Sequence, residues 1–301
     1  MRRGFVSGLQ TGIIVLTFMG AALTRMVAAD AFGSDGLEAE ELVYKTVGDV
    51  TLHLHMFKPE GWQASDRRPA IVFFFGGGWK DGTPRQFYRH SAHFAELGMV
   101  AFSAEYRVKS THGTSPFECV EDGKSAVRYI RANAGTLGVD PNRIVAGGGS
   151  AGGHVAACTA LIEGFEEGDN TGVSSKPNAM LLFNPVVDTT PKGYGARKLE
   201  GRTHELSPVH HVNGDAPPVM IFHGTKDTTV PFENIQRFCE TMEAAGNRCE
   251  VVVFEGARHG FFNYGRFENA FEVTLQKSDE FLESLGYLPV KNENARERES
   301  E

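Results

Sequence analysis

The chain has 301 residues, of which 41% are hydrophobic and 23% are charged, with 35 Gly and 13 Pro. This composition lies in the ordinary globular range and excludes a disordered chain, a collagen-like repeat and a bundle of membrane helices. The 30 Lys and Arg against 38 Asp and Glu give a net charge of −8. An acidic balance argues against nucleic acid as a partner, because sequence-independent binding needs a basic face.

The first residues have the pattern of an export signal peptide. Two arginines follow Met1, an apolar stretch covers 11–23, and small residues at 27–29 offer a cleavage site. We therefore expect residues 1–29 to be removed and the mature protein to be secreted or periplasmic, without stable membrane association. An uncleaved anchor is the alternative, because residues 4–23 have about the length that spans a bilayer.

Short apolar runs alternate with amphipathic windows along the rest of the chain. The alternation predicts one α/β domain over 30–290, with a mainly parallel, eight-stranded, doubly wound sheet and helices on both faces. The segment 188–213 has no strong period and is expected to be a small excursion, and the polar tail 291–301 is expected to be disordered. Predicted strands cover 42–47, 50–57, 70–75, 100–104, 144–146, 179–183, 219–222 and 250–254, and predicted helices cover 85–97, 117–134, 151–162, 232–245 and 269–285.

Four cysteines fit two pairs, and export would permit disulfides. Cys239 lies in a predicted helix and Cys249 opens the next predicted strand, so a short loop would bring them together. Cys119 and Cys158 lie near the starts of two helices that flank one strand, which makes a second pair. For these two, a role as small buried hydrophobic residues remains an equal alternative.

The strongest motif is Gly148-Gly149-Ser150-Ala151-Gly152, which follows one predicted strand and precedes a predicted helix. A serine in a tight strand-to-helix turn needs small neighbours, because a Cβ there would collide with the adjoining strand or helix. The turn also puts Ser150 at a helix amino terminus, where free N–H groups favour developing negative charge. A plain glycine-rich turn is the alternative, because the pattern also arises by chance.

Three further signals lie at other strand ends. The loop Phe75-Gly76-Gly77-Gly78-Trp79 offers backbone N–H groups for an oxyanion, Asp227 follows the strand 219–222, and His259 follows the strand that ends at 254. The carboxyl ends of parallel strands meet at one sheet edge, so these residues are expected to lie together with Ser150. Their chain order, serine then aspartate then histidine, is that of catalytic triads on such sheets.

The ten other histidines show no ligand spacing with cysteines or carboxylates that would indicate a metal site. His154, four residues after Ser150, is expected to pack or hydrogen-bond beneath the turn. We expect no metal and no other cofactor.

With these motifs the sequence resembles the α/β-hydrolases, and specifically the acetyl esterase and lipase-like branch related to hormone-sensitive lipase and to bacterial feruloyl and acetylxylan esterases. The resemblance extends from about residue 44 to residue 288. Arg107 and Asp122 also match the branch, in which the equivalent Arg and Asp are structural. The four motifs that carry the resemblance are FGGGW (75–79), GGGSAGGH (147–154), HGTKDTTVP (223–231) and RHGFFNYG (258–265).

The resemblance implies a serine carboxylic-ester hydrolase. Ser150 would attack the ester carbonyl, His259 would take its proton, and Asp227 would fix the imidazole tautomer. Water activated by His259 would then release the acid. The oxyanion would be held by the N–H groups of Gly77, Gly78 and Ala151.

The sequence departs from the branch in two ways. Phe75 stands where the usual His-Gly-Gly-Gly has its histidine, which removes a side chain that braces the oxyanion loop. The helical amino-terminal cap is missing, which implies an open mouth. An open mouth suits polymeric or bulky esters, such as acylated plant or algal polysaccharides, better than long free lipid chains. The predicted substrates are short-chain acyl esters of the acetyl type, including esters of polysaccharides such as xylan, and Trp79 is a candidate substrate-binding residue.

Three rival functions are weighed against this one. A prolyl-oligopeptidase-like peptidase has a similar triad, but it needs a large propeller and usually a Tyr at the position of Ala151. An arylformamidase has an oxyanion loop similar to FGGGW, but export makes a role in tryptophan breakdown less natural. A binding module on an inactive hydrolase fold is the alternative outside enzymes, and the intact Ser150, Asp227 and His259 argue against it.

Overall fold

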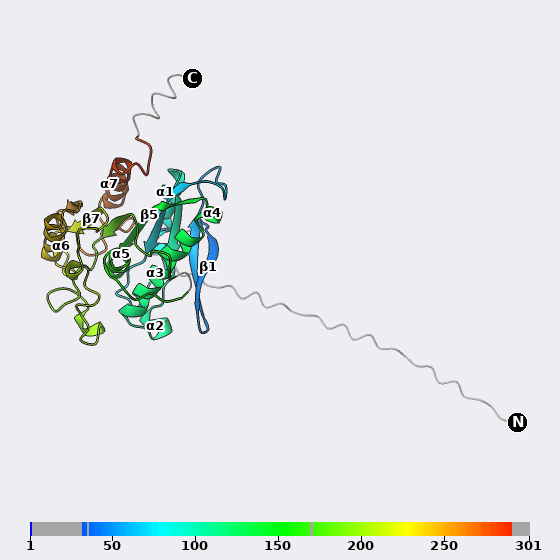
Figure 1. Cartoon of the computed structure of the whole chain (residues 1–301), viewed down its shortest axis with the longest axis horizontal. Coiled ribbons are helices and arrows are strands. Elements are labelled where there is room, and N and C mark those ends of the chain that lie inside the picture. Colours follow the sequence, from blue (N-terminus) through cyan, green and yellow to red (C-terminus); the bar gives the residue numbers. More distant parts are fainter. Residues whose placement is uncertain (2–31, 35, 169–170, 291–301) are drawn as a thin grey trace, which may run out of the picture. The chain divides into compact units, whose positions relative to one another are not determined.

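The computed structural model describes residues 1, 32–34, 36–168 and 171–290 (Figure 1). The chain divides into two units, Met1–Ala31 and Phe32–Glu301, and the fold below belongs to the second unit. Apart from Met1, the expected signal peptide lies outside the described residues, and so does the tail 291–301. Within the described ranges no helix combines the length and the apolar character needed to cross a bilayer.

The predicted strands form one sheet with the order β1-β2-β4-β3-β5-β6-β7-β8. Strand β2 pairs antiparallel with β1 and β4, and all neighbours from β4 to β8 pair parallel. The mainly parallel, eight-stranded sheet is therefore confirmed in the described part of the chain. The strands are β1 (Glu40–Val47), β2 (Val50–Phe57), β3 (Arg68–Phe74), β4 (Val100–Ala104), β5 (Val139–Gly149), β6 (Ala179–Phe183), β7 (Val219–Gly224) and β8 (Cys249–Phe254).

Strand β5 is longer than the predicted 144–146. Val139 pairs with Arg68 of β3, and the register then shifts before Ile144 pairs with Ala70. The residues Asp140-Pro141-Asn142 inside this irregularity are typical of a turn, which hid the first half of the strand in the sequence.

The predicted helices are present, and short helical turns join them. The window 85–97 begins as a 3-10 turn, Pro84–Phe87, before α1 starts. Helix α3 begins after Ser115, whose side chain and that of Glu118 form a capping box. The helices are α1 (Tyr88–Glu96), α2 (Lys109–His112), α3 (Pro116–Ala132), α4 (Ala134–Leu137), α5 (Ala151–Leu161), α6 (Phe232–Ala244) and α7 (Ala270–Ser284).

Helices cover both faces of the sheet, because alternate side chains of the central strands are apolar on both sides. Val72 and Phe74 of β3 pack into a core that contains residues of α3, α5 and α6. Ile71 and Phe73, one position earlier on the same strand, pack into a second core with residues of α1 and α7. This two-sided burial is the doubly wound arrangement expected from the apolar strands.

An ion-pair group ties the antiparallel edge of the sheet to α3. Arg107 Nε lies 2.8 Å from Asp122 Oδ2, and Lys45 Nζ of β1 lies 2.6 Å from Asp122 Oδ1. The Asp122 side chain is fully buried, so loss of its partners would leave an uncompensated charge in the core. The contacts fit the structural role expected for Arg107 and Asp122.

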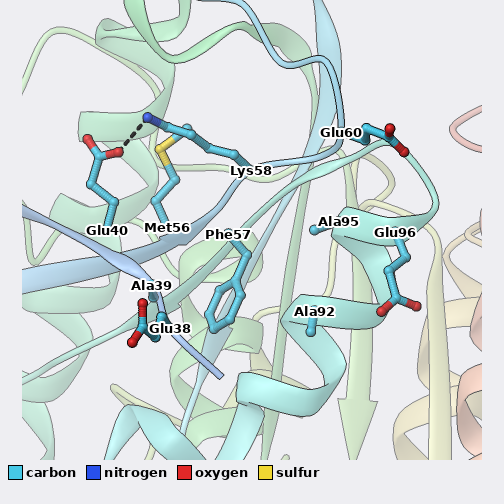
Figure 2. A pocket seen from close by; sticks show the side chains of 10 residues that line it. All are labelled: Glu38, Ala39, Glu40, Met56, Phe57, Lys58, Glu60, Ala92, Ala95 and Glu96. Carbon is cyan, nitrogen blue, oxygen red and sulfur yellow. Dashed lines mark hydrogen bonds and ion pairs between the residues drawn. The ribbon is translucent and has the colours of Figure 1, made fainter. Parts of the chain in front are cut away.

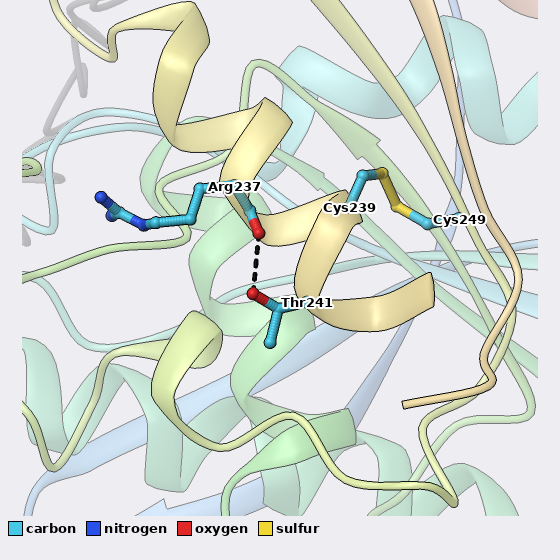
Figure 3. The surroundings of a disulfide bond; sticks show 4 residues. All are labelled: Arg237, Cys239, Thr241 and Cys249. Atoms are coloured by element: carbon cyan, nitrogen blue, oxygen red, sulfur yellow. Dashed lines mark hydrogen bonds between the residues drawn. A yellow bond between two sulfur atoms is a disulfide. The ribbon is translucent and has the colours of Figure 1, made fainter. Parts of the chain in front are cut away.

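The two expected cysteine pairs have different outcomes. Cys239 of α6 and Cys249 of β8 form a disulfide (Figure 3). Cys119 and Cys158 are buried and free, so their expected pairing was wrong. Their sulfur atoms face different partners, since the Cys119 thiol donates to the Arg107 carbonyl and Cys158 Sγ lies 3.4 Å from His154 Nε2.

The chain between β6 and β7 makes the expected small excursion. It contains two 3-10 turns, Ala196–Lys198 and Pro208–His210, and it buries Leu199 and Leu206 against the main core. An ion pair between Asp188 and Arg237 of α6 fixes its start. The segment forms no separate lid domain, and no large cap lies over the carboxyl edge of the sheet in the part of the chain that the structure describes.

Candidate active site

Ser150 occupies a strained turn between β5 and α5. Its φ of 55° lies in the left-handed region that residues with a Cβ seldom adopt. Glycines make the turn possible: a Cβ on Gly152 would lie 2.0 Å from the Phe74 carbonyl oxygen, and one on Gly149 would lie 2.3 Å from the Phe262 ring. The small residues of the motif are therefore required by close backbone and side-chain contacts, as the sequence predicts.

The structure brings the three residues at the strand ends into one hydrogen-bonded chain. His259 Nε2 lies 2.8 Å from Ser150 Oγ, and His259 Nδ1 lies 2.6 Å from Asp227 Oδ2. A carboxylate only accepts hydrogen bonds, so Nδ1 carries the proton and Nε2 is free to accept from the serine hydroxyl. This tautomer is the one in which an imidazole can act as a base toward Ser150.

Asp227 is buried and held by several donors. Its Oδ1 accepts hydrogen bonds from the backbone N–H groups of Thr229 at 2.8 Å and Val230 at 2.9 Å. Burial by itself raises the pKa of the Asp227 carboxyl, but the hydrogen bond and charge of His259 and these N–H groups outweigh it, so the pKa lies below its ordinary value. Asp227 is thus held in the ionised form beside the imidazole.

His223, from the same HGTKD segment, is a fully buried neighbour of Asp227. Its Nε2 lies 3.6 Å from Asp227 Oδ2 and donates to the Val230 carbonyl at 2.9 Å. Burial lowers the pKa of His223, which keeps the ring neutral and leaves His259 as the hydrogen-bond partner of the carboxylate.

The glycine loop after β3 lies against the serine turn. A Cβ on Gly76 would come within 3.4 Å of Ser150 Cβ, and Gly77 and Gly78 have φ values of +132° and +64° that favour glycine. Among the described residues, none accepts a hydrogen bond from the N–H groups of Gly77, Gly78 or Ala151. These are the three donors that the sequence assigns to the oxyanion.

Phe75 replaces a histidine brace with an aromatic one. Its ring stacks on Tyr106 with a centroid distance of 4.1 Å, and the Tyr106 hydroxyl donates to the Phe75 carbonyl at 2.6 Å. Both side chains are buried. The loop therefore keeps supporting contacts despite the departure from His-Gly-Gly-Gly.

A second set of contacts joins the glycine loop after β3 to the loop that carries His259. The sequence pattern does not predict these contacts. Gln86 Oε1 accepts from the Gly76 N–H at 2.6 Å, and Gln86 Nε2 donates to Asn263 Oδ1 at 3.0 Å. Asn263 Nδ2 donates in turn to the Gly260 carbonyl at 2.9 Å. This Gln86–Asn263 bridge connects the residue next to His259 with the residue next to Gly77.

Asn184, at the end of β6, is a further residue that the sequence did not single out. It is fully buried, has a φ of 36°, and its Oδ1 accepts from the Gly260 N–H at 3.0 Å. A left-handed asparagine directly after an apolar strand was the available signal. Its contact fixes the backbone on the carboxyl side of His259.

Trp79, the expected substrate-binding residue, is only 1% exposed. Its Nε1 donates to His154 Nδ1 at 3.2 Å, and His154 Nε2 donates to the Leu206 carbonyl at 2.7 Å. Burial lowers the pKa of His154 to about 4, which matches this neutral tautomer. Trp79 thus supports the loop from below, and His154 lies beneath the serine turn as expected.

Two cavities differ in their relation to these residues. One of about 480 Å³ opens beside the imidazole and is lined by His259, Gly260 and Asn263 among others. The other, of about 630 Å³, lies between α1 and the β1–β2 end of the sheet, where Lys58 pairs with Glu40 (Figure 2). Its lining includes none of Ser150, Asp227 and His259. In the described ranges no group of three or more His, Cys, Asp or Glu is arranged to hold a metal ion.

Comparisons with known proteins place the chain among hydrolases and esterases. The BD-FAE family model matches residues 54–193, and the dienelactone hydrolase family model matches residues 182–286. Thermogutta terrifontis esterase 2 phosphoramylated by tabun is 51% identical, with a TM-score of 0.81 over 84% of this chain and 97% of that chain. Its propionate-bound and butyrate-bound forms are 50% and 49% identical, each with a TM-score of 0.81 over 84% of this chain and 96% of theirs.

A curated relative extends the comparison to a longer protein. Esterase LipC of Mycobacterium tuberculosis is 30% identical over 216 residues, which are 64% of this chain and 53% of LipC. The chain spans about half the length of the curated relatives it matches. The likeness to Thermogutta terrifontis esterase 2 covers nearly the whole of that protein, and the sheet and the Ser150 turn agree with it. The chain therefore belongs to the α/β-hydrolase esterases.

Proposed function

We propose that this chain is a serine carboxylic-ester hydrolase that acts on short-chain acyl esters of the acetyl type. The observation that carries the proposal is the hydrogen-bonded chain from Ser150 Oγ through His259 to Asp227, next to three N–H groups without acceptors among the described residues. A nucleophile, a base with a fixed tautomer and an oxyanion site are the groups that ester hydrolysis requires.

In the first half of the proposed reaction, His259 Nε2 takes the proton of Ser150 as the serine oxygen attacks the ester carbonyl. The carbonyl oxygen becomes an oxyanion and accepts from the N–H groups of Gly77, Gly78 and Ala151. Removal of one such donor typically costs about 10²–10³ in turnover. His259 then gives its proton to the departing alcohol, which leaves the acyl group on Ser150.

In the second half, His259 takes a proton from water as the water oxygen attacks the acyl-serine carbonyl. The bond between the acyl carbon and Ser150 Oγ then breaks, His259 returns the proton to Ser150 Oγ, and the acid leaves. The imidazole carries positive charge in both halves, and ionised Asp227 stabilises that charge from the Nδ1 side. The low pKa of Asp227 supports this role, because a protonated carboxyl would not attract the charged ring. The residues supply every proton transfer, so the proposal includes no cofactor.

Two observations support a short acyl group. Thermogutta terrifontis esterase 2, about half identical to this chain, has solved structures with propionate and with butyrate bound. The described residues also place no large cap above the site, and long acyl chains gain most from an enclosed apolar channel. The same openness supports esters of polysaccharides such as xylan as candidate substrates.

The compartment is a second part of the proposal. A disulfide such as Cys239–Cys249 forms and persists in oxidising compartments, which supports export of the chain to the periplasm or the medium. A polymer that cannot enter the cell would meet the enzyme there.

Hydrolysis of 4-nitrophenyl acetate, butyrate, octanoate and palmitate, beside acetate release from acetylated xylan, tests the proposal. The full chain is compared with Ser150→Ala and with Ser174→Ala, an exposed serine as the control. We expect fast release from the two short esters, a fall with chain length, and loss of all activity only in Ser150→Ala. Equal hydrolysis by Ser150→Ala would overturn the proposed nucleophile, and a preference for palmitate would overturn the short acyl group.

A further inference from the structure

A cavity of about 300 Å³ adjoins the oxyanion loop on the side of Gly78 and Trp79. Three segments form it: the loop 78–80, the stretch 109–116 around α2, and the turn 197–200 between β6 and β7. It shares Gly78 with the candidate oxyanion site, and its volume lies at the lower end of the range for ligand pockets. A group bound in it would be a neighbour of the reacting ester.

The charge of this cavity is opposite to that of the whole chain. Four of its lining residues are cationic, Lys80, Lys109, Arg197 and Lys198, and one, Glu200, is acidic. The chain as a whole has a net charge of −8. A local excess of cations beside an active site attracts anionic substrates, because it raises their local concentration.

Three of these cations have no carboxylate partner in the described part of the chain. Lys80 Nζ lies 3.4 Å from Asp81 Oδ2, whereas no such ion pair involves Lys109, Arg197 or Lys198. Because these three cations are grouped around one cavity and none is neutralised by a carboxylate of the described residues, the cavity has room for an external anion.

Lys198 links the cavity to the oxyanion loop. Its ammonium donates to the Gly78 carbonyl at 2.9 Å and to the Tyr194 hydroxyl at 3.3 Å, and it lies 5.4 Å from the centre of the Trp79 ring. An ammonium has three donors, so one remains for a ligand. Lys198 thus contacts the same residue, Gly78, whose N–H is a proposed oxyanion donor.

We infer that this cavity binds a carboxylate carried by the ester substrate, so that the enzyme prefers acidic esters to neutral ones. The inference rests on the proposed ester hydrolysis. The carboxylate belongs either to the alcohol part, as in an acylated sugar acid, or to the acyl part, as in a half-ester of a dicarboxylic acid. Both present the same anion to Lys109, Arg197 and Lys198.

The test compares kcat/KM for matched esters at low and high salt. For the alcohol part, 4-acetoxybenzoate is compared with neutral 4-acetoxybenzamide. For the acyl part, 4-nitrophenyl hemisuccinate is compared with neutral 4-nitrophenyl butyrate. The quantity measured is the ratio of acidic to neutral ester, determined for the full chain and for each variant, so that intrinsic ester reactivity cancels between proteins.

A double variant, Lys109→Gln with Arg197→Gln, removes two positive charges from the cavity, and Glu200→Gln removes its one negative charge. Lys277→Gln on α7, outside the cavity lining, is the control. We expect the double change to lower the ratio of one ester pair by about fivefold, since an exposed charge pair contributes up to about 1 kcal/mol. Glu200→Gln should raise the same ratio, Lys277→Gln should leave it unchanged, and added salt should shrink the effect.

Each outcome decides one question. A ratio lowered for one pair supports the inference and identifies which part of the substrate carries the carboxylate. If both ratios are the same in the full chain, the double variant and Glu200→Gln, the carboxylate site is overturned. The proposed ester hydrolysis still stands in that case, provided that the neutral esters are hydrolysed. Absence of Ser150-dependent hydrolysis of every ester overturns both.

Discussion

Gln86 donates a hydrogen bond from its side-chain amide to Asn263 at 3.0 Å, across 177 positions of the sequence. The same glutamine accepts from the Gly76 N–H, and Asn263 donates to the Gly260 carbonyl. One loop carries Gly77 and Gly78, two of the proposed oxyanion donors, and the other carries the proposed base. The side-chain amides of Gln86 and Asn263 therefore hold these two loops in a fixed relative position. Such alignment matters because small misplacements of reacting groups cost large factors in rate.

Gln86→Ala is predicted to lower kcat about tenfold while KM changes little, because one hydrogen bond of alignment is worth about 1.4 kcal/mol in the transition state. Gln86→Glu keeps the acceptor for Gly76 and should recover part of kcat. Asn263→Ala should resemble Gln86→Ala, and the double variant should be no worse than either single one. Additive losses in the double variant, or a change in KM alone, would contradict a positioning role.

Asp227→Asn is predicted to fold normally and to lose about 10⁴ in kcat, as the comparable change does in another serine hydrolase. Asparagine presents an N–H₂ group or a weaker acceptor to His259 Nδ1, so the imidazole loses the tautomer that accepts from Ser150. The two backbone donors to Asp227, from Thr229 and Val230, remain able to bind an amide oxygen. Steady-state kinetics with 4-nitrophenyl acetate measures the loss, and near-full activity would refute the role.

The strand ends could be predicted from the sequence because each carries a local pattern. Glycines lie around Ser150 and after Phe75, and Asp227 and His259 lie in short loops that follow apolar runs. These patterns indicate which side chains reach the carboxyl edge. The Gln86–Asn263 bridge has no such local signal, since its partners meet only after the chain has folded. The first half of β5 was hidden by Pro141, whose neighbours are typical of a turn.

Burial was also hard to foresee for polar and aromatic loop residues. Trp79 lies in a glycine loop at the sheet edge. Nothing in the adjacent sequence indicates that its indole N–H donates a hydrogen bond to the buried His154. Cys119 and Cys158 were placed on neighbouring helices correctly, but the directions of their side chains depend on helix rotation. Side-chain direction in tertiary contacts is the part that periodicity does not determine.

Gly152→Ala is predicted to destabilise the fold by about 3 kcal/mol and to abolish activity, because the new Cβ would overlap backbone oxygens that cannot move cheaply. A Cβ on Gly152 would lie 2.0 Å from the Phe74 carbonyl and 2.3 Å from that of Phe75. Gly135→Ala in α4 is the control, since nothing lies within 4 Å of a Cβ there. Urea unfolding compares the two, and equal stabilities would show that the turn has room for a side chain.

His90 is predicted to make the fold sensitive to acid. The ring is 1% exposed, packs among Phe87, Phe183 and Phe271, and neither of its nitrogens has a hydrogen-bond partner among the described residues. Burial lowers the pKa of His90 to about 3. Because the pKa is lower in the folded state than in the unfolded one, its contribution to stability is complete above about pH 6.5 and is lost as the pH falls toward 3.

His90→Met should therefore reduce the fall in unfolding free energy below pH 6.5 by up to about 1.4 kcal/mol per pH unit. Methionine fills the space without a titrating group. Urea unfolding at pH 7, 6 and 5 gives the slope for the full chain, for His90→Met and for His204→Gln as an exposed control. An unchanged slope in His90→Met would assign the acid sensitivity to other groups.

The central claim is that Ser150 attacks the ester and carries the acyl group, and covalent labelling with paraoxon tests it most directly. Intact mass and peptide mapping after reaction measure how many diethylphosphoryl groups bind and where. The account predicts one group per chain, on Ser150, in step with loss of 4-nitrophenyl acetate hydrolysis, and no labelling of Ser150→Ala. Labelling of Ser150→Ala to the same extent, or full activity after Ser150 is labelled, would contradict it.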